Sequence, residues 1–99
     1  MKKYQLIGVK EALEGFKEYE LPCLDSRKSF YGKAHVIELA SGAVYLESYD
    51  TIVCKIENGQ FSRLWSGYSA TTQRHVNSFC RMFNGPVACK ADWDSLEVA

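Results

Sequence analysis

The dipeptide Asn58-Gly59 constrains the fold more than any other feature of this sequence. It is the preferred pair for a two-residue type I′ hairpin turn, because both residues tolerate the positive φ angles that this turn requires. The segments on either side alternate apolar and polar residues, as strands with one buried face do. We therefore expect an antiparallel hairpin here. The residues predicted for its buried face are Ile52, Cys54, Ile56, Phe61 and Trp65.

A second hairpin is predicted upstream, around Ser41-Gly42, between residues 31–40 and 43–49. A two-residue loop at this position would make one face of the hairpin aliphatic and the other polar. The pairs expected on the aliphatic face are Leu39 with Val44 and Ile37 with Leu46. Those expected on the polar face are Glu38 with Tyr45 and Val36 with Glu47. With residues 48–51 turning between the hairpins, the sequence predicts an antiparallel four-stranded meander.

A helix is predicted to follow the meander, from about Ala70 to Asn84. The apolar positions in this range have helical spacing. Either Ser69 or Thr71 can cap its first N–H groups, and Asn84-Gly85-Pro86 is a typical helix stop. We expect the helix to lie across the aliphatic face of the sheet. The residues of its core stripe are Thr72, Val76, Phe79, Cys80 and Phe83.

The two ends of the chain give weaker patterns. Val9, Leu13 and Phe16 are spaced as on a helix, so an N-terminal helix is predicted over residues 9–19, ended by Pro22. A loop is expected over residues 22–29. Residues 87–99 are expected to form a tail that folds back through Trp93. The predicted fold class is thus α+β.

Length and composition exclude several classes of protein. A chain of 99 residues supports one core, so residues 1–99 are expected to form a single domain. Residues 4–10 are too short and too polar for a signal sequence or a membrane span, which favours a cytoplasmic protein without membrane contact. A formal net charge of zero argues against a strongly polyanionic partner.

The cysteines and histidines do not have the spacing of a metal site. Structural zinc sites supply ligands in close pairs, which this sequence lacks, so no metal and no cofactor are expected. Without an export signal, free thiols are favoured over disulfides. A cysteine nucleophile paired with a histidine base has no positive support, and no catalytic residue is predicted. The residues considered are Cys23, Cys54, Cys80, Cys89, His35 and His75.

Arg63 is unusual because it falls on the apolar face of the second hairpin. Its side chain is expected either to reach the rim past Trp65 or to pair with a carboxylate, for which the acidic tail is a candidate. The structural role is favoured over a functional one.

Polar donors gather at the start and on the outward side of the predicted helix. Helix N-termini attract anions, so the donors around residues 67–75 could hold a phosphate, although simple capping is the alternative. Arg74 and Arg81 nearly superpose on the helix, with Ser78 between them, and all three are expected to be exposed. Neither arginine has a carboxylate three or four positions away. The candidate partner-binding or anion-binding residues are Ser69, Thr71, Thr72, Arg74, His75, Ser78 and Arg81.

Three segments resemble a pattern found in small proteins of Gram-positive gut bacteria, their plasmids and phages. They are Ser-Phe-Tyr-Gly-Lys-Ala at 29–34, Ser-Tyr-Asp-Thr at 48–51 and Gly-Tyr-Ser-Ala-Thr-Thr-Gln-Arg-His at 67–75, followed by Phe79. The resemblance spans about residues 29–85. Since that family has no established activity, the resemblance implies a bacterial or mobile-element setting and supplies no catalytic residues.

These observations favour a non-enzymatic interaction module that binds a macromolecular partner, either a protein or a nucleic acid. The main alternative is a nucleic-acid-binding protein that uses the helix near residues 70–84. A small enzyme with a cysteine–histidine site is the third possibility.

Overall fold

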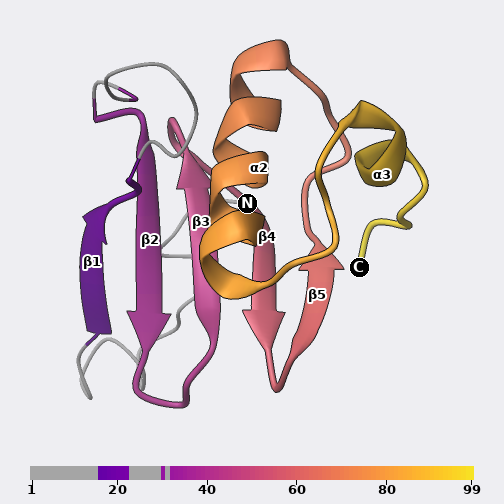
Figure 1. The fold of residues 1–99 in the computed structure, drawn as a ribbon. Helices are drawn as coiled ribbons and strands as arrows, with labels where there is room; N and C mark the ends of the chain where they lie inside the picture. Colours follow the sequence, from indigo (N-terminus) through magenta and orange to yellow (C-terminus); the bar gives the residue numbers. More distant parts are fainter. Residues whose placement is uncertain (1–15, 23–29, 31) are drawn as a thin grey trace.

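The computed structural model describes residues 16–22, 30 and 32–99 (Figure 1). Its strands form one antiparallel sheet in the order β1-β2-β3-β4-β5. Helix α2 lies across one face of this sheet, and the short helix α3 lies beyond β5. The elements are β1 (Phe16–Glu20), β2 (Ala34–Leu39), β3 (Val44–Ser48), β4 (Thr51–Glu57), β5 (Gln60–Arg63), α2 (Ala70–Phe83) and α3 (Lys90–Asp94). The α+β class, the antiparallel meander and the helix on one face are confirmed.

Over the described residues the sheet has five strands, so the predicted number of four is wrong. The additional strand is β1, which pairs antiparallel with β2 and sets Tyr19 opposite Val36. Residues 16–19 of this strand belong to the predicted helix 9–19, so the helix prediction is wrong there. Pairing with the open edge of β2 supplies β1 with backbone hydrogen bonds, and such tertiary contacts override a weak helical pattern. The rest of the predicted helix, and residues 23–29 of the loop predicted over 22–29, lie outside the described residues.

The hairpin at Asn58-Gly59 has the predicted register. Asn58 and Gly59 have φ angles of 53° and 77°, as the turn requires. The four pairs are Glu57 with Gln60, Ile56 with Phe61, Lys55 with Ser62, and Cys54 with Arg63. Ile56, Phe61 and Trp65 pack against the cluster beneath α2. The turn residues therefore predicted both the hairpin and which of its faces is buried.

Ile52 lies on the opposite face from the one predicted. Leu46 pairs with Cys54, but the next residue, Glu47, pairs with Ile52, so Val53 is an extra residue in β4. Such a β-bulge breaks the alternation of side chains along a strand. Val53 and Cys54 both belong to the cluster beneath α2, whereas Ile52 belongs to the cluster on the other side of the sheet.

The register predicted for the first hairpin is wrong by one residue. Val36 pairs with Leu46, and Ile37 pairs with Tyr45. The loop has three residues, 40–42, because Leu39 N–H donates to the Ala43 carbonyl. Gly42 supplies the positive φ that such a loop needs at its third position, with a value of 95°. The shift inverts β2 relative to β3, so Val36 lies with Leu46 in the cluster beneath α2, whereas Ile37 and Leu39 lie on the opposite face.

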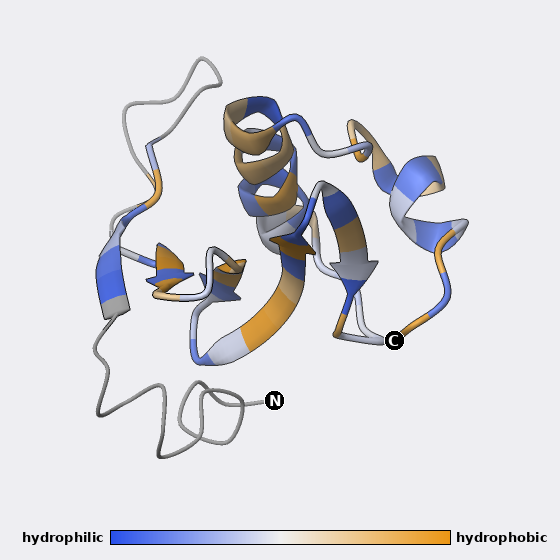
Figure 2. Cartoon of the chain, turned by 90° about the horizontal axis from the view of Figure 1, so that it is seen from below, coloured by the Kyte–Doolittle hydropathy of each residue, from blue (hydrophilic) through white to orange (hydrophobic). Residues whose placement is uncertain are grey.

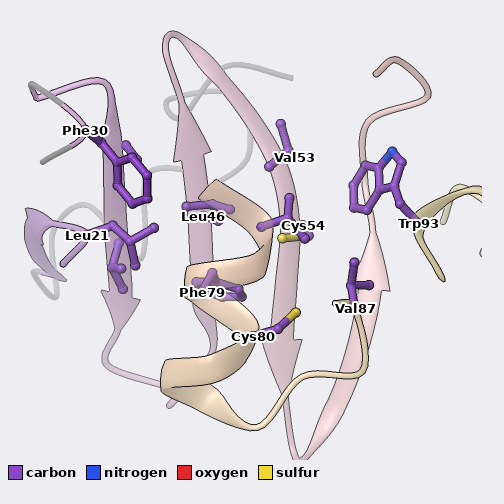
Figure 3. Close-up of a cluster of buried hydrophobic side chains, with 12 residues drawn as sticks. Leu21, Phe30, Leu46, Val53, Cys54, Phe79, Cys80, Val87 and Trp93 are labelled. Atoms are coloured by element: carbon purple, nitrogen blue, oxygen red, sulfur yellow. The ribbon is translucent and has the colours of Figure 1, made fainter. Parts of the chain in front are cut away.

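Both faces of the sheet consequently carry buried apolar clusters. The larger one joins the sheet to α2, and Figure 3 shows Leu46 and Cys54 of the sheet facing Phe79 and Cys80 of the helix. Colouring by hydropathy shows apolar segments along the strands beneath α2 (Figure 2). The cluster on the other face consists of Ile37, Leu39, Ala43, Tyr45 and Ile52.

Arg63 fastens the C-terminal segment to β5. Its guanidinium group is 4.5 Å from the centre of the Trp93 ring, and the side chain is 8% exposed. Its nitrogens donate to the carbonyls of Trp65, Ser66, Gly67, Trp93 and Leu96. Trp93 is buried, so the tail folds back as predicted. Arg63 thus has a structural role, as expected, but it is buried and binds backbone carbonyls, so it neither reaches the rim nor uses the carboxylate considered for it.

Candidate functional site

The predicted donor-rich helix start is a capped helix end. Ser69 is the N-cap of α2, and its hydroxyl accepts a hydrogen bond from Thr72 N–H at 3.0 Å. This bond satisfies one of the N–H groups that every helix leaves without an intrahelical partner. Of the two predicted caps, Ser69 is therefore the one used, whereas Thr71 is exposed.

Thr72 and His75 point towards the sheet rather than towards a ligand. The Ser48 hydroxyl at the end of β3 lies 2.9 Å from Thr72 Oγ1 and 2.8 Å from His75 Nδ1. All three side chains are buried, with exposed fractions of 2%, 5% and 1% for Ser48, Thr72 and His75. The structure thus brings these residues together in a polar network between β3 and α2.

Two aromatic rings enclose the imidazole of His75. The Phe30 ring meets it edge to face at 4.6 Å, and the Tyr49 ring lies tilted at 5.9 Å. Burial lowers the pKa of His75 to about 4, with a smaller contribution from the neighbouring Arg74 charge. The imidazole is therefore neutral at pH 7 and offers no positive charge to an anion. Its Nε2 has no hydrogen-bond partner among the residues that the structure describes.

Tyr49 occupies an uncommon backbone conformation. It is the first residue of the two-residue turn between β3 and β4, and its φ is 56°. Residues other than glycine, asparagine and aspartate lose roughly 1–2 kcal/mol in this region. Its N–H donates to the Lys33 carbonyl at 2.7 Å, and its side chain is 50% exposed. The turn thus holds a large aromatic ring at the surface above His75.

The predicted outward residues Arg74, Ser78 and Arg81 do meet at one place. With Asn77 and Ala88 they line a pocket of about 220 Å³ on α2. Arg81 is exposed, as predicted, whereas Arg74 is half-buried, with its guanidinium group 5.0 Å from the centre of the Phe30 ring.

Ser78 contradicts the prediction, since it is only 2% exposed. Its short side chain lies between the long side chains of Arg74 and Arg81, one turn away on either side. Arginine stems cover neighbouring surface while their charged ends reach outward. A small residue between them is therefore shielded from water even on the outward side of the helix.

The surroundings of His75 include three residues that were not among the predicted site residues: Phe30, Ser48 and Tyr49. The signal that could have found them is the resemblance pattern, because Phe30 lies in segment 29–34 and Ser48 and Tyr49 lie in segment 48–51. Together with His75 of segment 67–75, these residues connect all three segments of the pattern. Much of the pattern therefore consists of residues that pack and hydrogen-bond to one another.

The described cysteines and histidines do not form a metal site. Within residues 16–22, 30 and 32–99, no group of three or more potential ligands comes together. His35 Nδ1 lies 3.7 Å from Glu47 Oε1, away from His75. Cys54 and Cys80 are buried, Cys89 is exposed, and none of the three is in a disulfide. Cys23 lies outside the described residues.

Buried thiols of this kind are poor nucleophiles. Burial raises the pKa of Cys54 well above its usual value and raises that of Cys80 to about 11. Both thiols are therefore protonated at pH 7, whereas the thiolate is the reactive form.

In the described part of the chain, no helix has the length and apolar character needed to cross a bilayer.

Fold and site together define a small α+β protein in which one helix, fixed to a meander by a neutral polar network, presents an arginine-lined pocket. Residues 19–95 match a family of unknown function, DUF8033, and the chain belongs to this family. No curated protein and no solved structure is significantly similar to it.

Proposed function

We propose that this protein is a small non-enzymatic interaction module that binds a macromolecular partner through the outward side of α2. The observation that carries this proposal is the pocket of about 220 Å³ lined by Arg74, Asn77, Ser78 and Arg81. Guanidinium groups present planar sets of donors that match carboxylate and phosphate oxygens. Arginine is also among the residues that contribute most to binding at protein interfaces.

The attachment of α2 to the sheet supports this function. The hydrogen bonds that connect Ser48 with Thr72 and His75 fix the rotation of the helix about its own axis, so α2 presents its outward side in one orientation. A surface that is ordered before binding loses less conformational entropy when a partner docks.

Burial of the same network argues against catalysis. Ser48 and His75 resemble a hydroxyl nucleophile and its base, but Ser48 is 2% exposed and His75 is 1% exposed. A nucleophile must reach its substrate, and this pair lies under Phe30 and Tyr49.

The resemblance over residues 29–85 supports a bacterial or mobile-element setting, for which we propose a cytoplasmic location.

The proposal is tested by replacing both arginines. Arg74→Ala with Arg81→Ala removes the charged groups of the pocket and the contact of Arg74 with the Phe30 ring. The apolar contacts of α2 with the sheet remain, so the fold should persist, and capture of partners from a bacterial lysate should fall by roughly tenfold or more. The matched control is Lys17→Ala with Lys55→Ala, which removes the same charge at β1 and β4. Quantitative mass spectrometry compares the captured proteins. Equal capture by wild type and the arginine double variant would refute the proposal.

A nucleic-acid partner is the second candidate, favoured by the position of both arginines on one side of α2. Their Cα atoms are separated by about 10 Å along the helix axis, given the rise per residue of a helix. Fluorescence anisotropy with a random-sequence DNA duplex and a DNA single strand, each over a range of salt concentrations, distinguishes this function. The slope of the logarithm of the binding constant against the logarithm of the salt concentration measures phosphate contacts. If this slope decreases in magnitude by about one or two in the arginine double variant, the arginines contact phosphates.

A further inference from the structure

The outer edge of β5 has backbone groups that do not face β4. Leu64 N–H donates to the Val53 carbonyl at 2.9 Å, which identifies this pair as hydrogen-bonded. Such pairs alternate along an antiparallel ladder, so Ser62 and Gln60 are also bonded to β4. The N–H and C=O groups of Phe61 and Arg63 consequently point to the other side, towards the edge of the sheet.

The C-terminal segment already uses half of this edge. Val98 forms a parallel bridge with Arg63, and Ala99 N–H donates to the Arg63 carbonyl at 2.7 Å. Phe61 lies two residues earlier on the same edge. Its outward N–H and C=O have no backbone partner among the residues that the structure describes. The edge therefore accepts strand pairing at one end and remains open at the other.

A pocket lies beside this open end. It has a volume of about 410 Å³ and is formed between the tip of the β4–β5 hairpin and the segment that follows α2. Volumes of this size are typical of ligand sites. The residues that matter for recognition are Ile56, Phe61 and Pro86, which give apolar walls, and Gln60 and Asn84, which carry amide groups. None of its lining residues is charged.

Strand geometry connects the open edge with the pocket. Residues paired across two strands place their side chains on the same face of the sheet. Phe61 faces the α2 side, since it packs against the cluster beneath that helix. A residue paired with Phe61 would therefore direct its side chain to the α2 side as well, where the pocket lies.

We propose that β5 binds an extended peptide segment of a partner at Phe61, and that this peptide places an uncharged, apolar side chain in the adjoining pocket. In strand addition of this kind, backbone hydrogen bonds supply affinity and a side-chain pocket supplies specificity. The absence of charge in the lining selects against acidic and basic side chains, whose desolvation would not be compensated. This site is separate from the arginine-lined pocket, so neither proposal depends on the other.

The test is an NMR titration of ¹⁵N-labelled protein with acetylated, amidated pentapeptides. Three peptides carry Val, Leu or Phe at the centre of a Thr-Ser-X-Ser-Thr frame, and a fourth carries Glu there. We expect saturable shifts at the Phe61 amide and at the side-chain amides of Gln60 and Asn84 for at least one apolar peptide. Glu at the centre should weaken binding roughly tenfold or more. N-methylation of both the central residue and the residue after it should do the same, because it removes the N–H that the Phe61 carbonyl accepts in either strand orientation.

Two protein variants complete the experiment. Pro86→Glu places a charge at an exposed position of the pocket rim and should weaken the apolar peptides, whereas Arg74→Ala with Arg81→Ala should bind them like wild type. The proposal is overturned if none of the three apolar peptides gives saturable shifts at peptide concentrations up to about 5 mM. A dissociation constant of that size corresponds to a binding free energy near 3 kcal/mol. It is also overturned if the N-methylated peptide binds as well as its parent.

Discussion

At the scale of single residues, His75 is a neutral connector between the sheet and α2. Its Nδ1 is hydrogen-bonded to Ser48, while the rings of Phe30 and Tyr49 contact the imidazole. The Ser48 hydroxyl can donate to Nδ1 and accept from Thr72, so one proton arrangement forms both hydrogen bonds, while the Nε2–H of His75 has no partner among the described residues. Protonating the imidazole would remove its acceptor and bring a charge into a buried site. The folded protein therefore resists this protonation.

This resistance predicts a pH dependence of stability. The folded pKa of His75 is about 4, below its usual value of 6.5. Between these two values the unfolded chain binds more protons than the folded one, so stability falls as the pH decreases from about 6.5 to 4. The full difference corresponds to about 3 kcal/mol. Urea denaturation at several pH values from 7 to 4 measures it.

The matched control for this prediction is His75→Asn, which keeps a hydrogen-bonding side chain but does not titrate. Carboxylates also titrate in this range, so the relevant quantity is the wild-type free energy of unfolding minus that of the variant. That difference should shrink with decreasing pH. A difference that stays constant from pH 7 to 4 would show that His75 is protonated equally easily in both states.

The sequence predicted which residues belong to the site better than it predicted which way their side chains point. Ser69 is one of the two predicted caps, and Arg81 is exposed as predicted, whereas Arg74 is half-buried against Phe30. Thr72 was assigned both to the core stripe and to the donor set, and only the packing of α2 against β3 decided between them. His75 was grouped with the donors because its residue type suggests binding. Its burial depends on Phe30 and Ser48, which are 45 and 27 positions away in the sequence.

At the scale of elements, local turn chemistry explains which hairpin was predicted correctly. Asn58-Gly59 specifies one turn type, and the register follows from it. Ser41-Gly42 is compatible with loops of two or three residues, so its register was undetermined locally. The bulge at Val53 and the pairing of β1 depend on neighbouring strands. No periodicity within a single segment contains that information.

The capping bond at the start of α2 gives a prediction at this scale. Ser69→Ala removes the hydroxyl that accepts the Thr72 N–H, and should lower the free energy of unfolding by about 1 kcal/mol. Thr71→Ala is the matched control, because Thr71 is exposed and does not cap the helix, so it should change stability by less than about 0.5 kcal/mol. Thermal or urea denaturation measures both. Equal effects of the two substitutions would contradict the assigned cap.

At the scale of the whole molecule, the described cysteines report on the opening of the core. Cys54 lies in β4 and Cys80 in α2, so the cluster between sheet and helix shields both thiols. Cys89 is exposed just before α3. Raised pKa values reduce the reactivity of the two buried thiols further.

We expect iodoacetamide at pH 8 to alkylate Cys89 rapidly in the native protein. Cys54 and Cys80 should react at least roughly a hundredfold more slowly, because they become accessible only when α2 separates from the sheet. Peptide mapping by mass spectrometry over a time course measures each rate. In about 6 M urea the three rates should become similar. Rapid native labelling of Cys54 would show that the helix detaches without global unfolding.

Arg63 also implies an order of events in time. Its guanidinium group binds carbonyls two and three positions away, at Trp65 and Ser66, and others 30 and 33 positions away, at Trp93 and Leu96. The carbonyls of Trp65 and Ser66 become available once the β4–β5 hairpin closes. The carbonyls of Trp93 and Leu96 require the closure of a much longer loop, which costs more conformational entropy and is therefore slower. The C-terminal segment therefore docks late in folding, onto an arginine whose side chain the hairpin has already oriented.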